Sequence, residues 1–283
     1  MILKMATFEN WSEVSSESLL NYSILGFDLD DTLTAHGILP ASVLKGLEAA
    51  QRAGWRVVLV TGRPCGWADA LIKLLPFDAV VAENGAGLFV WPTGKQSRQE
   101  REEPSKFFWQ TSGEYSQTLP KDLKAQHAAT SAEIFKRVPR AKVSSDQPYR
   151  IYDLAIDFAE EVNPPLGLDE AQEIANIFES RGAVAKVSSI HVNGWWGHFS
   201  KVDGFRKLLA VTGWGQLSEV IYVGDSPNDS PLFEAAGLSV GVANVRDFQN
   251  VEGFRGPRYV CAQRQSAGAL EVLEKISVLR RRS

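Results

Sequence analysis

Two pairs of acidic residues stand where apolar strands should end. Asp28 and Asp30, one residue apart, follow the apolar run ILGF, and Asp225 and Asp229 follow the apolar run VIYV. Carboxylates are costly to remove from water, so acids clustered at the end of a buried strand need a compensating positive charge. Magnesium, a hard cation that prefers oxygen ligands, is the compensation that we expect.

A second group of polar residues is suited to bind phosphoryl oxygens. Thr61, Gly62 and Arg63 end the apolar run VVLV, and Lys201 precedes a predicted helix. A hydroxyl, free backbone amides and an ammonium group are good partners for phosphoryl oxygens. In a parallel sheet, ligands gather beyond the carboxyl ends of the strands. One sheet edge could therefore collect a metal ion, a nucleophile and a phosphate-binding loop.

These residues resemble the four-motif signature of the haloacid dehalogenase superfamily phosphatases. The motifs occur in that family's order, as Asp28-x-Asp30-x-Thr32, Thr61-Gly62-Arg63, Lys201 and Gly224-Asp225-x-x-Asn228-Asp229. Four ordered motifs are far more specific than one pair of acids, and the resemblance covers residues 22 to about 280. The long insertion between the second and third motifs is similar to the large α/β-cap subclass. That subclass includes sucrose-phosphate, mannosyl-3-phosphoglycerate and trehalose-phosphate phosphatases.

The resemblance implies a role for each acidic residue. Asp28 would attack the phosphorus atom and form an aspartyl-phosphate. Asp30 would protonate the leaving alkoxide and then activate the hydrolytic water. Mg²⁺ would bind the Asp28 carboxylate, the backbone carbonyl of Asp30 and Asp225. Asp229 would be a further metal ligand or would orient Lys201.

The resemblance also implies how the phosphoryl group is held. Its oxygens would be bound by Thr61, Gly62, Lys201 and Asn228. Lys201 would in addition keep Asp28 ionised, because an adjacent cation lowers the pKa of a carboxyl group.

The elements that must position these residues alternate between strands and helices. Short apolar runs predict strands, and helical spacing of apolar residues predicts helices (strands 24–27, 55–60, 79–81, 220–223; helices 41–53, 67–75, 202–211, 266–279). Such alternation indicates parallel pairing with right-handed crossovers. We therefore expect an α/β fold with a doubly wound, mainly parallel, Rossmann-like sheet.

A different pattern occupies the middle of the chain. It predicts an irregular stretch, two helices and two strands (91–116; 121–137, 168–181; 149–158, 183–191). We interpret residues 88–198 as an α+β cap domain inserted into a catalytic core made of residues 22–87 and 199–283. Residues 1–21, polar and rich in Ser and Glu, are expected to form a mobile or loosely docked extension.

Composition and charge limit the kinds of molecule that the protein is expected to bind. The chain of 283 residues has a formal net charge of −4, so no general electrostatic attraction to nucleic acid or anionic membranes is expected. No apolar run approaches the roughly 20 residues that span a bilayer, and the N-terminus lacks a secretory pattern. Cys65 and Cys261 are too few for a disulfide framework. We expect a cytoplasmic monomer or homodimer that binds a small phosphorylated metabolite.

Several residues outside the four motifs are candidates for substrate contact. Arg63 either contacts substrate or pairs with a structural acid. Glu83 and Asn84 follow the third strand, at the mouth of the predicted site or in a turn that Gly85 requires. Arg150 is either the contact for a second anion or an ordinary charge on the cap surface.

The segment His191–His198 has two possible interpretations. If the segment is extended, His191, Asn193 and Trp195 share one face. An exposed tryptophan beside polar groups suits a sugar ring. The alternative is that this tryptophan packs between cap and core.

Together the residues predict a magnesium-dependent phosphatase of a small phosphomonoester, with a sugar or glycosyl phosphate as the favoured substrate. A sugar phosphomutase with the same intermediate is one alternative. A non-catalytic sugar-phosphate sensor is another, although a binder has no need of the proton shuttle that Asp30 would supply. A large cap disfavours a protein-bound phosphate.

Overall fold

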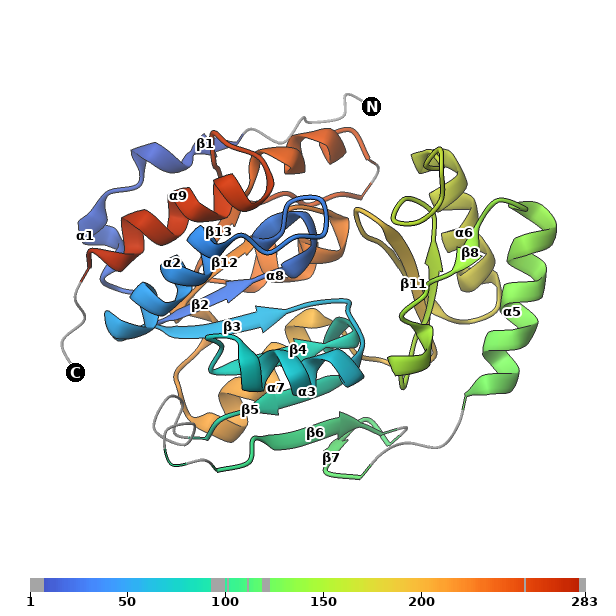
Figure 1. Ribbon diagram of the computed structural model, residues 1–283, viewed down its shortest axis with the longest axis horizontal. Helices are drawn as coiled ribbons and strands as arrows, with labels where there is room; N and C mark the ends of the chain where they lie inside the picture. Colours follow the sequence, from blue (N-terminus) through green and yellow to red (C-terminus); the bar gives the residue numbers. More distant parts are fainter. Residues whose placement is uncertain are drawn as a thin grey trace.

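The computed structural model of the protein describes residues 8–92, 100, 102–110, 112–118, 123–251 and 253–279. It contains a ten-stranded sheet and a separate four-stranded sheet. Figure 1 shows the two sheets in two lobes, with the smaller lobe, built by residues of the middle of the chain, at the right. None of the helices in these described ranges combines the length and the apolar character needed to span a membrane.

The large sheet is mainly parallel, as the sequence predicts. Its strands follow one another across the sheet as β1 (Glu9–Asn10), β14 (Tyr259–Val260), β13 (Leu238–Gly241), β12 (Val220–Gly224), β2 (Ile24–Phe27), β3 (Arg56–Val60), β4 (Ala79–Ala82), β5 (Gly87–Val90), β6 (Ser105–Trp109) and β7 (Tyr115–Ser116). Pairing is parallel from β1 to β4 and antiparallel from β4 to β7. The fold class is therefore confirmed.

Helices cover both faces of the large sheet, and the strands are apolar for that reason. One face packs on α2 (Ala41–Arg52), α3 (Cys65–Leu74) and α9 (Gln265–Ser277). The other face packs on α7 (Lys201–Thr212) and α8 (Ser230–Ala235). A strand buried on both faces reads as a continuous apolar run rather than an alternating one.

Short helical turns follow or precede several of these strands. They are η2 (Leu29–Leu33), η3 (Glu83–Gly85), η5 (Leu217–Glu219), η6 (Pro227–Asp229) and η7 (Ala243–Phe248). Three of them, η2, η3 and η6, follow the carboxyl ends of β2, β4 and β12. The motif residues thus lie just beyond the ends of parallel strands, where the sequence analysis expects them.

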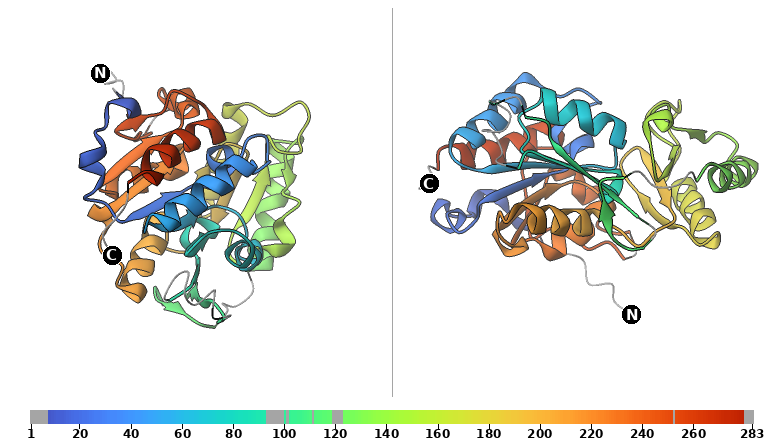
Figure 2. Two further views of the ribbon diagram at one scale, coloured as in Figure 1. Left: turned by 60° about the vertical axis from the view of Figure 1, so that its left-hand side comes forward. Right: turned by 90° about the horizontal axis from the view of Figure 1, so that it is seen from below.

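The smaller lobe is an antiparallel sheet covered by two helices. Its strand order is β10 (Val184–Val187), β11 (His191–Trp195), β9 (Leu154–Asp157) and β8 (Lys142–Val143). Helices α5 (Lys124–Arg137) and α6 (Leu168–Ser180) contribute to its apolar core. A Cβ on Gly194 would lie 2.0 Å from the ring of Phe178, so glycine allows α6 to pack directly on β11. Figure 2, in its right-hand view, shows this lobe beside the carboxyl ends of the large sheet's strands.

Three local predictions differ from the structure. The stretch 91–116, expected to be irregular, contains β6 and β7, which extend the large sheet beyond the predicted boundary at residue 87. The predicted strand 149–158 begins later, after a helical turn η4 (Gln147–Tyr149). The predicted strand 183–191 ends at Val187, and a turn leads from it into β11 at His191. Pairing with other strands sets the limits of these elements, and a local apolar pattern does not record that pairing.

The described part of the N-terminal segment is packed on the core rather than loosely docked. Strand β1 pairs with β14, a turn η1 (Trp11–Glu13) buries Trp11, and α1 (Ser16–Leu19) buries Leu19. Both side chains join the cluster that holds α9. Residues 1–7 lie outside the described residues. Because the segment is polar overall, its composition did not predict that Trp11 and Leu19 would be buried.

The pair Leu19 and Leu20 tests this packing. Leu19 is fully buried and Leu20 is 49% exposed. We expect Leu19→Ala to lower the free energy of unfolding by about 2–5 kcal/mol, because it leaves a cavity in the core. The matched change Leu20→Ala should cost less than about 1 kcal/mol. Urea unfolding of both variants measures the difference, and equal effects would contradict the docking.

Candidate active site

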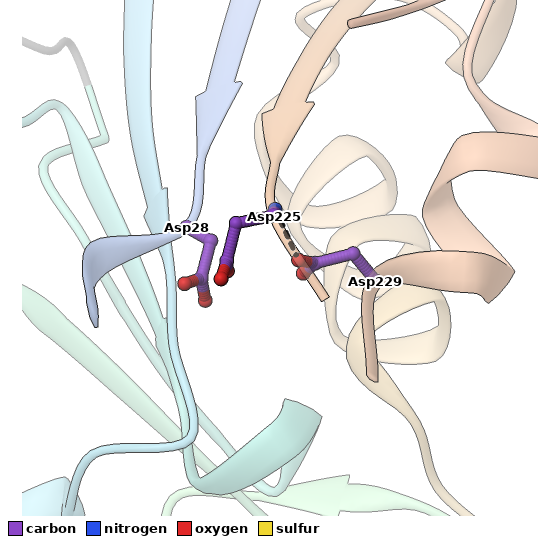
Figure 3. Close-up of side chains that lie close together, drawn as sticks. All are labelled: Asp28, Asp225 and Asp229. Carbon is purple, nitrogen blue, oxygen red and sulfur yellow. Dashed lines mark hydrogen bonds between the residues drawn. The ribbon is translucent and has the colours of Figure 1, made fainter. Parts of the chain in front are cut away.

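Three buried carboxylates meet beyond the ends of two neighbouring parallel strands. Asp28 follows β2, Asp225 follows β12, and these strands are paired in register. Asp229 lies in η6, one short turn further on. One oxygen from each carboxylate lies within 4.8 Å of the other two. Figure 3 shows Asp28 and Asp225 projecting side by side, with Asp229 beyond them.

Lys201 supplies a positive charge to this cluster. It is the first residue of α7, and its side chain is almost fully buried. Its Nζ donates to Asp28 Oδ1 at 2.6 Å, to Asp229 Oδ1 at 2.7 Å and to Asn228 Oδ1 at 3.3 Å. Burial alone would lower the pKa of Lys201, but Asp229 and Asp28 raise it above its ordinary value. The side chain is therefore an ammonium ion at neutral pH.

Asp229 is held by four donors, which favours one of its two predicted roles. Its Oδ1 also accepts from the Tyr222 hydroxyl at 2.6 Å. Its Oδ2 accepts from the backbone N–H groups of Asp225, at 3.0 Å, and Ser226, at 3.2 Å. With both oxygens engaged in protein hydrogen bonds, Asp229 is better placed to orient Lys201 than to bind a metal ion.

Asp225 is positioned by two side chains, one of which the sequence analysis missed. Thr32 Oγ1 donates to Asp225 Oδ1 at 3.4 Å, and Asn244 Nδ2 donates to Asp225 Oδ2 at 3.1 Å. Asn244 also donates to the carbonyl of Asp31 at 3.1 Å. Because it follows β13 at the same sheet edge, the rule that identified Asp225 would also have found it.

The cluster holds more negative charge than Lys201 can balance. Burial, reinforced by Asp229 and Asp30, raises the pKa of Asp28 to about 8 against the opposing effect of Lys201. Burial and the neighbouring Asp28 and Asp229 likewise raise the pKa of Asp225 well above its ordinary value. A further cation would restore the ionised forms. The carboxylate oxygens of Asp28 and Asp225 suit Mg²⁺, and among the described residues Asp28 Oδ2 receives no hydrogen bond.

The predicted phosphate-binding loop lies beside the cluster. Thr61 Oγ1 accepts from the backbone N–H of Arg63 at 2.9 Å, which shapes the turn. Gly62 and Asn228 line a small cavity over Asp28. Asn84 lies behind the loop, because a Cβ on Gly62 would be 3.2 Å from Asn84 Oδ1. Asn84 is buried with both amide atoms unpaired among the described residues, and it does not line that cavity.

Arg63 pairs with the predicted acid–base residue and with the cap. Its Nε and Nη2 donate to the two oxygens of Asp30, each at 2.9 Å. Its Nη2 also reaches Glu160 Oε1 at 2.6 Å, and its Nη1 reaches Asp146 Oδ2 at 3.2 Å. The alternative that Arg63 pairs with an acid is therefore confirmed. Sequence reasoning missed Glu160 and Asp146, since no motif marks them.

The two predictions for Arg150 are both wrong. Its side chain is completely buried, so it is not a surface charge. Its guanidinium binds Asp146 at 2.7 Å, Asp153 at 2.9 Å and the carbonyl of Gly62 at 2.7 Å. A completely buried guanidinium with four of its five N–H donors bound by the protein is not available to a second anion. Arg150 instead ties the cap to the phosphate-binding loop.

Glu83 also joins cap to core and does not face substrate. Its oxygens accept from the backbone N–H groups of Cys65 at 2.8 Å, Ile151 at 2.9 Å and Tyr152 at 2.7 Å. Burial, together with nearby Asp153, raises its pKa to about 7. The prediction that Glu83 stands at the mouth of the site is wrong, because the side chain is fully buried beneath Ile151 and Tyr152 of the cap and does not line the cavity over Asp28.

Two of the three residues predicted on one face of β11 reach the cavity, and the third does not. His191 and Asn193 line the cavity over Asp28. Trp195 is 1% exposed, stacks on Phe199 with ring centres 5.4 Å apart, and donates its Nε1 to the carbonyl of Phe199 at 3.2 Å. The alternative that Trp195 packs between cap and core is therefore confirmed, and the prediction that it stacks on a sugar ring is wrong.

The cavity over Asp28 is closed by the cap. Its volume is about 10 Å³, at the lower limit for holding a single water molecule. A phosphorylated molecule cannot enter this space unless the cap moves away from the core. The structure therefore represents a closed arrangement of the site.

Comparison with known proteins places the chain among hydrolases. Residues 25–248 match the family described as haloacid dehalogenase-like hydrolase. The chain is 24% identical over 261 residues to a phosphoglycolate phosphatase of Methanobrevibacter smithii, covering 90% of this chain and 99% of that protein. It is 28% identical over 226 residues to a phosphoglycolate phosphatase of Metallosphaera sedula, covering 77% and 84%.

Solved structures share the fold. A protein of Thermoplasma acidophilum superposes with a TM-score of 0.65 at 17% identity, covering 91% of this chain and 99% of that one. A subclass IIB sugar phosphatase of the haloacid dehalogenase superfamily gives 0.59 at 16%, covering 90% and 99%. The sucrose-phosphatase of Synechocystis gives 0.57 at 18%, covering 90% and 97%. The match over most of the length shows that the chain belongs to the haloacid dehalogenase-like hydrolase family.

Proposed function

We propose that this phosphatase is a magnesium-dependent enzyme that hydrolyses a small phosphomonoester, with a sugar or glycosyl phosphate as its substrate. The observation that carries the proposal is the contact of Lys201 with both Asp28 and Asp229, beside a third buried carboxylate, Asp225. A buried nucleophile, a fixed cation and an oxygen-rich metal position are what phosphoryl transfer requires. The cap suits a small metabolite rather than a protein.

Asp28 is the nucleophile in this mechanism. One carboxylate oxygen forms a bond to phosphorus while the bond from phosphorus to the alkoxide oxygen breaks, which leaves an aspartyl-phosphate. Lys201 keeps the carboxylate in place and neutralises charge on the transferring group. Mg²⁺, held by Asp28, the Asp30 carbonyl and Asp225, would supply further neutralisation of the phosphoryl oxygens.

Asp30 is the acid–base residue. It gives a proton to the leaving alkoxide and then takes a proton from the water that hydrolyses the aspartyl-phosphate. Arg63 fixes the orientation of its carboxylate through two hydrogen bonds of 2.9 Å. Since Arg63 also binds the cap, closure of the cap and alignment of Asp30 are coupled.

Gly62 and Asn228 would bind the phosphoryl oxygens from the core side. Both line the cavity over Asp28. The carbonyl of Gly62 accepts from Arg150 in the closed cap, so the cap also restrains the peptide that follows Gly62. Closure over the substrate would exclude bulk water from the reacting group.

The nucleophile is tested by Asp28→Asn. We expect phosphate release to fall by about 10³-fold or more, because an amide cannot form the aspartyl-phosphate. The adjacent change Asp31→Asn is the matched control. Asp31 has a positive φ of 55°, which asparagine tolerates, and its side chain bonds Gln265, so most activity should remain. A fully active Asp28→Asn variant would remove this residue from the mechanism.

The acid–base role is tested by Asp30→Asn. The change should slow formation and hydrolysis of the aspartyl-phosphate by about 10²–10⁴-fold. The Mg²⁺ concentration for half-maximal activity should stay near that of the unchanged enzyme, because only the backbone carbonyl of Asp30 is proposed as a ligand. A variant whose sole defect is weak Mg²⁺ activation would show that the side chain has been assigned the wrong role.

The metal is tested by thermal unfolding with and without Mg²⁺. Binding to the folded state should stabilise the protein, by about 2.7 kcal/mol at 100 times the dissociation constant. EDTA should abolish phosphate release and excess Mg²⁺ should restore it. Asp225→Asn should weaken Mg²⁺ binding at least about 10-fold, while Asp247→Asn, at an exposed ion pair, should not. Activity that persists in EDTA would rule out metal dependence.

A further inference from the structure

Arg63 has no hydrogen-bond donor left for a substrate. A guanidinium group carries five N–H donors. Five hydrogen bonds join Arg63 to Asp30, Asp146 and Glu160, at distances from 2.6 to 3.2 Å. Its side chain is only 6% exposed. The arginine that lies between core and cap is therefore saturated by carboxylates of the protein itself.

The second arginine of this region is also bound by groups of the protein. Arg150 is buried, and its donors bind Asp146, Asp153 and the Gly62 carbonyl. It does not line either of the two cavities that meet at Asp30. One of these is the small cavity over Asp28, and the other, of about 430 Å³, opens to solvent beside it.

The remaining basic side chains along these two cavities, among the described residues, are two histidines. His191 Nε2 lies 2.8 Å from Glu160 Oε2, so it already faces a carboxylate. His36 lies on an exposed turn at the rim of the larger cavity. Neither supplies an unpaired cation in the closed interior of the site.

The ionic groups between core and cap are predominantly acidic. Arg63 and Arg150 contribute +2, and the four carboxylates that they bind contribute −4, so the group has a net charge of −2 (Asp30, Asp146, Asp153, Glu160). Glu160 is the member that lines the larger cavity from the cap, and its side chain is 28% exposed. A carboxylate in that position repels an anion and accepts hydrogen bonds from hydroxyl groups.

We infer that Glu160 determines which leaving groups the enzyme accepts: it excludes those with a carboxylate or second phosphate and admits neutral, hydroxyl-bearing ones. The inference rests on the proposed phosphatase function, and names the class of substrate for that site. The phosphate end of the substrate meets Lys201 and the metal position, whereas the leaving group meets the acidic side of the cap. The substrate is a polyol or sugar monophosphate with one anionic end.

A matched pair of substrates tests the discrimination. 2-Hydroxyethyl phosphate and phosphoglycolate differ only in a CH₂OH group against a carboxylate. With Mg²⁺, the unchanged full-length enzyme should have a kcat/KM at least tenfold higher for 2-hydroxyethyl phosphate. Equal rates, or a preference for phosphoglycolate, would overturn the inference.

Glu160→Gln tests the residue. The amide keeps the size of the side chain and removes its charge, so the preference between the two substrates should shrink about tenfold, mainly through a lower KM for phosphoglycolate. Glu161→Gln is the control. The Glu161 side chain is exposed, accepts a hydrogen bond from Ser145 and lines neither cavity, so the preference between the two substrates should not change. An unchanged preference in Glu160→Gln, or an equal shift in both variants, would contradict the role of Glu160.

Failure of the phosphatase function itself would look different. p-Nitrophenyl phosphate, an activated ester, should release phosphate with Mg²⁺ in the unchanged enzyme and in both variants. If it is not hydrolysed, the proposed function fails. If it is hydrolysed while the two matched substrates are not distinguished, only the inference about Glu160 fails. Glu160→Ala provides a second variant should Glu160→Gln not fold, and the same loss of preference is expected.

Discussion

The site depends on one buried ammonium group placed between two buried carboxylates. Lys201 lies within 2.7 Å of both Asp28 and Asp229, in a region from which water is largely excluded. Ion pairs in such places are stable only when geometry and further hydrogen bonds compensate for lost hydration. The donors that hold Asp229, from the Tyr222 hydroxyl and from the backbone N–H groups of Asp225 and Ser226, provide this compensation. The parallel sheet makes the arrangement possible, because strand ends from distant parts of the chain meet at one edge.

The cap extends the same network of charges instead of merely covering it. Arg63 connects Asp30 to carboxylates on the cap, and Arg150 connects the cap to the carbonyl of Gly62. Opening the cap would break both connections at once, and closing it would restore the alignment of Asp30, the proposed acid–base residue, and of the proposed phosphate-binding loop. The cavity over Asp28, of about 10 Å³, is too small for a phosphorylated molecule, so binding of the proposed substrate would require such movement.

The residues that the core domain contributes to the site could be predicted from the sequence, because they directly follow predicted strands. Asp28 directly follows β2 and Asp225 directly follows β12, so their meeting could be inferred from parallel pairing alone. Arg150 and Trp195 could not be interpreted this way. Arg150 is buried against Gly62, which is far away in the chain. Trp195 stacks on nearby Phe199, which in turn packs on the distant Trp109, within the same apolar cluster as Phe89. Local patterns record which faces are apolar, and they do not record which charged side chain a second domain will cover.

The core side and the cap side of the site therefore favour opposite charges on the substrate. On the core side, buried carboxylates exceed the single ammonium of Lys201, so the proposed Mg²⁺ would balance their charge and would attract the phosphoryl dianion. On the cap side, carboxylates exceed guanidinium groups, and every donor of Arg63 is already used. A substrate with one anionic end and one neutral, hydroxylated end can place its phosphate on the core side and its hydroxyl groups on the cap side. A molecule with anions at both ends is favourable only on the core side, because its second anion would have to displace Glu160 from Arg63.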